Sequence, residues 1–492
     1  MTMATILRAV VLAAGLSTVA DATEPGAGSP DSRTIAAHPQ VRGALNLLDR
    51  WIEAHQIYER VPGISVGVVL NQDLIWHTGY GLANVAQRIP ADADTVYSIC
   101  SISKLFTSIA VMQQRDAGRL QLDDPVARHL DWFDVEQAHP DSGAITVRGL
   151  LTHSSGLPRE SLPPYWNPDY PFPSRAAMIE ALGRQRTLYP ADRYFQYSNL
   201  ALTLAGEVAA AVAGKPYAEL VRDDILTPLG LSDTRTFLPT GLHGSAMALG
   251  YAALDRAGER ALEPAFDTAG ITPAAGFTSN VRDLARFAAW QFRLLDDGGT
   301  EVLRASTLRE MQRVHWVDPD WKTTWGLGFA VRKLDDDTLV SHGGSCPGYT
   351  TAFTMVPKHR LAVIVLTNAN GTAPGRIARA VYQALGPALK KARDDGAPAD
   401  LPDLSAYEGL YQNPPWSSEV AMVQQGQHLL VADLPSDDLD EDLQKLARVG
   451  GDVFQRVRDD GDDPGETWTF SRDANGAVSG VAMHGVRMTR VR

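Results

Sequence analysis

A serine and a lysine three residues apart, Ser101 and Lys104, are the best candidates in this sequence for nucleophilic chemistry. Apolar residues at helical spacing follow them to about Asp116, with Gly118 beyond, and predict a helix whose first turn carries both side chains on one face. A serine hydroxyl becomes nucleophilic when a neighbouring base takes its proton, and a desolvated lysine amine can be that base. The helix N-terminus adds unpaired N–H groups where an oxyanion would form. These residues predict covalent catalysis.

Two further segments supply polar groups that could meet this pair. The segment Tyr197–Asn199 precedes a predicted helix over residues 200–213 and places a phenol and an amide in a loop. The segment His342–Ser345 follows a predicted strand, and its glycines would let a substrate backbone approach closely. Because Ser-x-x-Lys is common by chance, the prediction depends on these segments meeting Ser101 in the fold.

The order and spacing of the three segments resemble the Ser-x-x-Lys, Tyr-x-Asn and Lys/His-x-Gly motifs of the class C β-lactamase, DD-peptidase, D-aminopeptidase and esterase superfamily. Further stretches look like signatures of the same family: Leu150–Pro158, Pro228–Leu231, Ala275–Ser279, Trp325–Phe329 and Gly343–Gly348. The resemblance implies an α/β fold of the β-lactamase/transpeptidase type over residues 40–390. In that fold an antiparallel sheet is flanked by helices and carries an inserted helical lobe.

The resemblance also implies catalytic roles. Ser101 would be the acylated nucleophile and Lys104 its base. Tyr197 would carry a proton to the leaving group and help to activate the deacylating water. The backbone N–H groups of Ser101 and Ser345 would form the oxyanion hole.

Substrate-binding residues follow from the same resemblance. Asn199 would position a substrate amide or carbonyl, Gly344 and Ser345 would border the substrate, and His342 would replace the lysine of the third motif. An imidazole holds a carboxylate less firmly than a lysine near neutral pH. We therefore expect hydrolysis of a small amide or ester, foremost a D-amino-acid-containing peptide or an ester. A β-lactamase and a penicillin-binding sensor without turnover are the alternatives.

Two other patterns carry less weight. His153 lies within a family signature, but nothing in the sequence places it beside the nucleophile, so we predict a hydrogen-bonded structural histidine. The stretch 342–344 also resembles the oxyanion motif of α/β-hydrolases, but no Gly-x-Ser-x-Gly elbow follows it. That fold is therefore excluded.

The elements that must position these motifs come from both ends of this region. Hydrophobic periodicity predicts helices over residues 41–57, 281–295 and 376–389 and strands over 63–70, 74–81, 338–341, 349–356 and 361–367. The intervening section is mainly helical, so one sheet should combine early and late strands around an inserted lobe.

The C-terminal part has a different pattern. Residues 390–403 have neither helical nor strand periodicity and predict a linker. Short strands at 420–423, 429–432, 467–470 and 478–483 then predict a small β domain over residues 400–492. This segment is similar to the lipocalin-like barrels of some family members, which commonly border the cleft.

The composition excludes several classes of partner. The chain has 492 residues and a formal net charge of -13, whereas nucleic-acid binding needs clustered Lys and Arg. Its 12 histidines show no zinc-binding spacing, so we expect neither a metal nor another cofactor. The expected partner is a small-molecule or peptide substrate, and the oligomeric state stays open.

The first residues are typical of an export signal. An apolar run from Ala9 to Ala20 follows Arg8, and Ala20–Ala22 has the small-x-small pattern of a cleavage site. The run is too short to span a bilayer. We expect residues 1–22 to be removed and the mature protein to be periplasmic or secreted, without stable membrane insertion.

Two cysteines, Cys100 and Cys346, flank the nucleophile and the third motif. Export makes a disulfide chemically possible, but a bridge requires Cα atoms within about 7 Å and aligned Cβ vectors. Free cysteine also packs well as a small hydrophobe. We therefore predict two free thiols.

Overall fold

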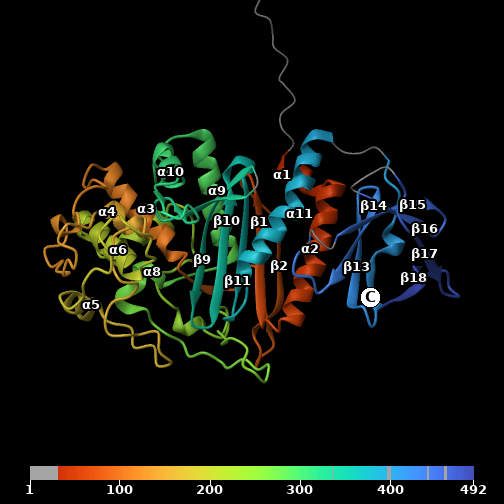
Figure 1. Ribbon diagram of the computed structural model, residues 1–492, viewed down its shortest axis with the longest axis horizontal. Coiled ribbons are helices and arrows are strands. Elements are labelled where there is room, and N and C mark those ends of the chain that lie inside the picture. Colours follow the sequence, from red (N-terminus) through yellow and green to blue (C-terminus); the bar gives the residue numbers. More distant parts are fainter. Residues whose placement is uncertain (1–30, 335, 396–399, 440–442, 459–462, 492) are drawn as a thin grey trace, which may run out of the picture.

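The computed structural model describes residues 31–334, 336–395, 400–439, 443–458 and 463–491. The predicted signal peptide, residues 1–22, lies outside this range. Figure 1 shows a central sheet with a helical lobe on one side and two long helices on the other, beyond which lies a barrel. Within the described residues, no helix is both long enough and apolar enough to cross a membrane.

The central sheet has nine strands in the order β3-β2-β1-β11-β10-β9-β8-β7-β6, and every pair is antiparallel. Early and late strands meet where β1 pairs with β11, as the sequence predicts. The strands are β1 Gly63–Leu70, β2 Asp73–Asn84, β3 Ile89–Pro90, β6 Trp316–Val317, β7 Thr324–Trp325, β8 Ala330–Leu334, β9 Asp337–Cys346, β10 Tyr349–Val356 and β11 Leu361–Thr367.

Both faces of the sheet centre are buried, which explains the continuous apolar runs of β1 and β11. In β11, Ile364 and Leu366 face one apolar cluster, whereas Val363 and Val365 face another. The second cluster includes α2 (Pro39–Tyr58) and α11 (Pro374–Asp395), and the first includes α9 (Val281–Asp297). Such alternation is the strand period expected of a buried sheet.

The helical lobe is inserted between β4 (Tyr97–Cys100) and the later sheet strands. Strand β4 pairs with β5 (Phe277–Ser279) in a separate small sheet at the base of the lobe. The other helices are α1 Ser32–Ala37, α3 Ser103–Asp116, α4 Val147–Leu151, α5 Arg175–Leu182, α6 Asn199–Ala213, α7 Tyr217–Val221, α8 Thr272–Ala275 and α10 Ala305–Met311. The predicted fold class, with its inserted lobe, is confirmed.

The C-terminal part is a closed barrel of eight antiparallel strands around an aromatic core that includes Trp468 and Phe470. Four of the strands were not predicted, because β12, β16 and β19 have only five residues each and β15 alternates few apolar residues with charged ones. The strands are β12 Gly409–Asn413, β13 Ser417–Gln425, β14 His428–Leu434, β15 Gln444–Gly450, β16 Val453–Val457, β17 Thr467–Arg472, β18 Val478–Met483 and β19 Val486–Arg490.

One expectation about this part is wrong. Helix α11 continues to Asp395, so residues 390–395 are helical and not linker; the last turns bury Leu389 and Ala392 against the second apolar cluster. The barrel packs on α2, across the sheet from the helical lobe, and does not lie on the lobe's side (Figure 1).

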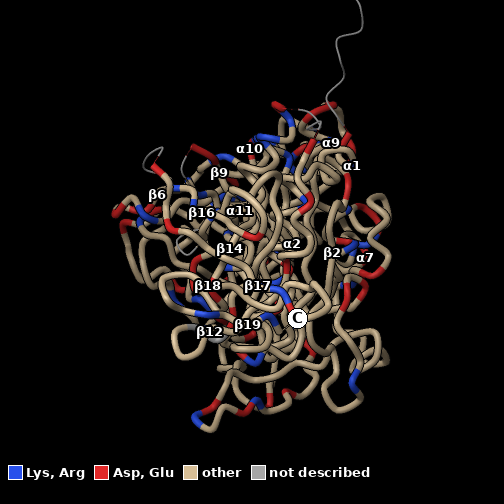
Figure 2. Tube along the Cα trace, turned by 90° about the vertical axis from the view of Figure 1, so that its right-hand side faces the viewer, with Lys and Arg blue, Asp and Glu red and all other residues tan. Residues whose placement is uncertain are grey.

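Viewed from the barrel end, basic and acidic residues are interspersed over the chain (Figure 2).

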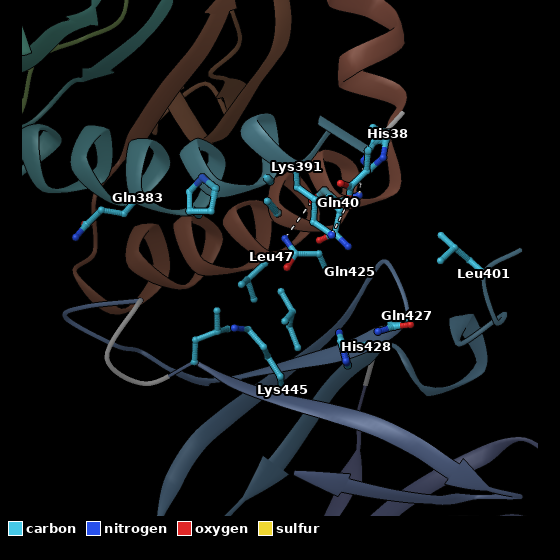
Figure 3. A pocket seen from close by; sticks show the side chains of 17 residues that line it. His38, Gln40, Leu47, Gln383, Lys391, Leu401, Gln425, Gln427, His428 and Lys445 are labelled. Carbon is cyan, nitrogen blue, oxygen red and sulfur yellow. Dashed lines mark hydrogen bonds and ion pairs between the residues drawn. The ribbon is translucent and has the colours of Figure 1, made fainter. Parts of the chain in front are cut away.

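The seam between α2 and the barrel is closely packed. The Trp51 indole N–H donates to the Ser436 carbonyl at 3.1 Å, and the Gln425 side-chain amide donates to the Gln40 carbonyl at 3.1 Å. A hollow of about 540 Å³ opens at the edge of this seam, between Lys391 of α11 and His428 of β14 (Figure 3). The seam therefore combines a close apolar contact with a polar, open rim.

Candidate active site

The lysine and serine of the first motif meet at the start of α3. Ser101 lies in the turn between β4 and α3, and Lys104 lies in the first turn of the helix. The Lys104 Nζ lies 3.0 Å from the Ser101 Oγ. The Ser103 hydroxyl secures this turn, since it donates to the Cys100 carbonyl and accepts the Phe277 backbone N–H at 3.0 Å.

Lys104 is completely buried and contacts three oxygen atoms. Besides Ser101, its Nζ lies 2.7 Å from Asn199 Oδ1 and 2.8 Å from the Ala274 carbonyl oxygen. Burial lowers the pKa of Lys104 well below its usual value, against the opposing effect of the Glu160 carboxylate. A neutral amine has two N–H bonds, which match the two carbonyl oxygens, and a lone pair for the Ser101 hydroxyl. The arrangement therefore suits proton acceptance.

Tyr197 lies beside the same serine. Burial raises the pKa of the Tyr197 phenol, whereas its hydrogen bond with Ser101 lowers it. The Lys104 ammonium position is 4.9 Å from the centre of the Tyr197 ring. With its pKa raised, the phenol stays protonated near neutral pH and can donate a proton.

Asn199 is the first residue of α6, where the Ser198 hydroxyl caps the helix by accepting the Ala201 N–H. The Asn199 side chain is held from both ends, because its Oδ1 faces Lys104 and its Nδ2 donates to Glu160 Oε1 at 2.6 Å. An amide nitrogen carries two protons. One N–H of Asn199 therefore remains for a substrate carbonyl.

Glu160 is a residue that the motif search does not identify. Its Oε2 accepts the Tyr165 hydroxyl at 2.5 Å, so both carboxylate oxygens are engaged. The only sequence signal was its position two residues after the Leu150–Pro158 signature. Through Asn199, Glu160 orients the group that faces Lys104.

The third motif lies within β9, which extends to Cys346, and not after the predicted strand end at Ser341. A Cβ atom added at Gly344 would lie 2.3 Å from the Ile99 carbonyl oxygen and 2.4 Å from the Thr351 Oγ1. Glycine is therefore required for β9 to lie directly against β4. The sequence suggested an approach of substrate, whereas the structure shows an approach of two strands.

His342 is buried next to the catalytic tyrosine candidate. Its ring centre is 6.2 Å from that of Tyr197 and 5.6 Å from that of Trp325. Burial, together with the nearby Lys104, lowers the pKa of His342 to about 3. The imidazole is therefore neutral at physiological pH.

His153 is structural, as expected, but it lies closer to the site than expected. Its Nδ1 accepts the Ser198 backbone N–H at 3.0 Å, and its ring stacks on Tyr197 with centres 4.3 Å apart. The Trp325 ring centre is 5.2 Å from that of His153 and 6.2 Å from that of Tyr197. His153 and Trp325 thus form an aromatic wall behind Tyr197, and both lie in signature stretches whose roles the spacing alone does not reveal.

Cys100 and Cys346 form a disulfide, with their Cα atoms 5.7 Å apart. The prediction of two free thiols is therefore wrong. The physical reason is the contact at Gly344, which brings β4 and β9 within the range that a bridge requires. The bridge joins the residue before Ser101 to the residue after Ser345, so each predicted oxyanion-hole residue is the neighbour of a bridged cysteine.

Comparison with known proteins assigns the part of the chain that carries this site to a family. The family model described as "Beta-lactamase" matches residues 48–388. "Protein flp" of Staphylococcus aureus (strain MW2) is 27% identical over 332 residues, which cover 66% of this chain and 63% of that protein. The chain spans about six-tenths of the length of the first curated relatives it matches.

Two solved structures have the same fold. The octameric penicillin-binding protein homologue from Pyrococcus abyssi is similar with a TM-score of 0.60 and 24% identity, covering 91% of this chain and 100% of that one. The β-lactamase/D-alanine carboxypeptidase from Yersinia pestis has a TM-score of 0.59 and 22% identity, covering 70% of this chain and 98% of that one. The similarity to these structures supports the fold.

Proposed function

This chain belongs to the β-lactamase family, and we propose that it is an exported serine hydrolase that forms an acyl-enzyme at Ser101. Its substrate is a small amide or ester, foremost a D-amino-acid-containing peptide or an ester. One observation carries the proposal: the buried amine of Lys104, with its lowered pKa, lies 3.0 Å from the Ser101 hydroxyl oxygen.

Acylation follows from these positions. The neutral Lys104 amine takes the Ser101 proton as Oγ bonds to the substrate carbonyl carbon, and the carbonyl oxygen becomes an oxyanion. Backbone N–H groups of Ser101 and Ser345 stabilise that charge. Collapse of the intermediate breaks the bond to the leaving nitrogen or oxygen, which receives a proton from the Tyr197 hydroxyl; Lys104 returns a proton to Tyr197.

Deacylation reverses the proton path. A water molecule loses its proton to the Tyr197 and Lys104 pair as its oxygen bonds to the acyl carbon, and the Ser101 oxygen leaves with a proton. The remaining N–H of Asn199 holds a carbonyl of the acyl group. These side chains, the two backbone N–H groups and water therefore account for both half-reactions.

His342 favours peptides and esters over β-lactams as the main substrates. A neutral imidazole offers a carboxylate a hydrogen bond but no charge, whereas the lysine-bearing third motif supplies both. The Yersinia pestis protein is named both as a β-lactamase and as a D-alanine carboxypeptidase, so β-lactam hydrolysis and penicillin binding without turnover stay in the test as alternatives.

The test combines covalent labelling with a substrate panel. A fluorescent phosphonate should label the wild-type protein once, at Ser101, and should not label Ser101→Ala. Ser108→Ala is the matched control, since Ser108 lies on the same helix with a buried hydroxyl that makes no hydrogen bond among the described residues. Labelling at another residue would contradict the assignment.

The panel contains D-amino-acid amides, D-Ala-D-Ala peptides, nitrophenyl esters and a chromogenic cephalosporin. We expect turnover of a D-amino-acid substrate or an ester to exceed that of the cephalosporin. Stable acylation by penicillin without turnover of any compound would favour the sensor. Fractionation of cells that express the full chain tests export, and a shortened protein in the periplasm or medium is expected; a full-length protein confined to the cytoplasm would contradict it.

A further inference from the structure

Arg159 is a charged residue at the active site to which neither the motifs nor the mechanism assigns a role. Its guanidinium carbon lies 5.0 Å from the centre of the Tyr197 ring, and its side chain is 59% exposed. The Arg159 carbonyl accepts the backbone N–H groups of Asn199 at 2.8 Å and Leu200 at 3.1 Å. The backbone of Arg159 is thus fixed to the start of α6, next to the residues that face the substrate.

The guanidinium has unused hydrogen-bonding capacity. Its Nε lies 3.3 Å from Glu160 Oε1, and its two terminal nitrogen atoms donate no hydrogen bond to any residue that the structure describes. Guanidinium presents five N–H donors in a planar fork that matches a carboxylate. Four of these donors belong to the two terminal nitrogen atoms, which are free to bind a ligand.

The Glu160 carboxylate beside Arg159 is already hydrogen-bonded within the protein. Its carboxylate oxygens already accept hydrogen bonds from Asn199 and Tyr165, so it offers little to a substrate ammonium group. The two basic residues other than Arg159 that lie near Tyr197 are poor partners for an anion. Lys104 is enclosed by oxygen atoms, and His342 is buried and neutral. Of these three basic residues beside Tyr197, only Arg159 therefore presents an accessible positive charge.

We propose that Arg159 binds a carboxylate of the substrate and makes the enzyme selective for anionic amides or esters. This inference rests on the proposed serine hydrolase function and names its substrate class. The carboxylate would belong either to the acyl part or to the leaving group, on the side of the site formed by Tyr197 and Asn199. Arg159 sits beside the phenol and makes no hydrogen bond to Ser101 among the described residues, so its main contribution is to substrate binding. Its charge also lowers the pKa of Lys104 and of Tyr197.

Two matched pairs of esters test this proposal. Mono-4-nitrophenyl adipate and its methyl ester differ by one carboxylate in the acyl part, whereas 3-acetoxybenzoate and its methyl ester differ by one in the leaving group. We expect the anionic member of one pair to have a higher kcat/KM by about 10- to 100-fold, the range of a charged hydrogen-bonded contact. The pair that responds identifies the location of the carboxylate.

Variants assign the preference to Arg159. Arg159→Gln should remove the preference through a higher KM for the anionic ester alone. A change in kcat that is the same for both esters would report the loss of the Arg159 charge beside Lys104 and Tyr197, and not the loss of a substrate contact. Arg159→Lys should keep part of the preference, because a lysine retains the charge but not the fork. Arg193→Gln is the matched control: this exposed arginine also lies over a tyrosine ring, 5.2 Å from the centre of Tyr194.

The outcomes separate this inference from the function beneath it. The role of Arg159 would be overturned if wild type and Arg159→Gln preferred the anionic ester equally, or if Arg193→Gln lost as much of that preference as Arg159→Gln. Turnover of the neutral ester would still support the hydrolase function in either case. Absence of both ester turnover and phosphonate labelling at Ser101 would overturn the proposed function and this inference together. Thermal melting of Arg159→Gln should match that of the wild type, which keeps a folding defect from imitating the result.

Discussion

Two glycines make nearly the same contact in two regions of this molecule. A Cβ atom added at Gly344 of β9 would lie 2.3 Å from the Ile99 carbonyl oxygen, and one added at Gly43 of α2 would lie 2.4 Å from the Gln424 carbonyl oxygen. The first contact joins β9, which carries Ser345, to β4, which ends one residue before Ser101. The second joins the hydrolase region to the barrel.

The surroundings of the two contacts differ. Near Gly344, a buried amine, an amide and a phenol are arranged around one serine by directional hydrogen bonds. Around Gly43, the α2 helix and the barrel bury apolar side chains that include Leu47 and Leu430. Hydrogen bonds depend steeply on distance and angle, whereas apolar burial depends mainly on area. The same small displacement should therefore reduce turnover at the first contact and only stability at the second.

Removal of the Lys104 amine is the strongest test of the hydrogen-bonded arrangement around Ser101. Lys104→Met should lower kcat/KM by about 10²- to 10⁴-fold, the usual contribution of a general base. Lys104→Arg should also be inactive, because a guanidinium stays protonated. Lys215→Met, at an exposed lysine, is the matched control. Initial rates on a neutral ester measure the effect, and more than a tenth of wild-type activity in Lys104→Met would show that another group takes the proton.

The pH profile tests the protonation state of the same amine. Only the neutral amine accepts the Ser101 proton, so kcat/KM should fall as the pH drops through the pKa of Lys104. Because burial lowers that pKa well below 10.5, the enzyme should keep its activity well below pH 10.5. A rate that rises only as the pH approaches 10.5 would show that the buried amine titrates like a free lysine.

Gly344→Ala tests the strand contact. The added methyl group must push β9 away from β4, and a shift of about 1 Å in a catalytic group can cost about 100-fold in rate. We expect a loss of this order in kcat, with the protein still folded by circular dichroism. Gly343→Ala serves as the comparison, since its Cβ would lie 3.4 Å from the Thr351 carbonyl oxygen. A larger loss in Gly343→Ala than in Gly344→Ala would favour substrate approach as the reason for these glycines.

Much of the fold was predictable because local sequence decides it. Strand β11 is an apolar run and β10 is rich in β-branched and aromatic residues, both lie between turns, and their observed bounds equal the predicted ones. Helices α6 and α9 likewise start at polar capping residues, Ser198 and Asn280. By contrast, β15 and β19 bury one apolar residue each, Leu446 and Met488, so their pattern is too weak to identify a strand.

The site was predictable only where a motif names the residue. Arg159 and Glu160 act through contacts with α6, which starts 39 residues after Glu160. The disulfide depends on two chain segments 246 residues apart that approach at one glycine. No local pattern encodes such distances, so spacing identified the chemical groups but not the partners that hold them.

The disulfide bears on both quantities compared above, because it stabilises the fold and also holds the strands next to Ser101 and Ser345. Cys346→Ser, paired with Cys100→Ser, should lower the free energy of unfolding by about 2–4 kcal/mol, because a cross-link over a long loop restricts the unfolded chain. Turnover should fall only severalfold, since Gly344 still permits the strand contact. Urea unfolding and initial rates measure both effects, with dithiothreitol-treated wild type as a second route to the same state. Unchanged stability in the double variant would contradict this role for the bridge.

Gly43→Ala should have the smallest effect on turnover. Its methyl group would clash with the Gln424 carbonyl oxygen and with Gln425 at the barrel, and overpacking of this kind costs about 1–3 kcal/mol. Gly375→Ala is the matched control, because it adds the same methyl group to the first turn of α11, where no described atom beyond its chain neighbours and its own helix backbone lies within 4 Å. Urea unfolding should therefore show a loss of stability in Gly43→Ala and none in Gly375→Ala, while kcat on a neutral ester stays at the wild-type value in both. A kcat loss in Gly43→Ala comparable to that in Gly344→Ala would show that the seam between α2 and the barrel is coupled to the active site through the sheet. The contact at Gly43 would then be as sensitive to small displacements as the contact at Gly344, and the contrast between them would not hold.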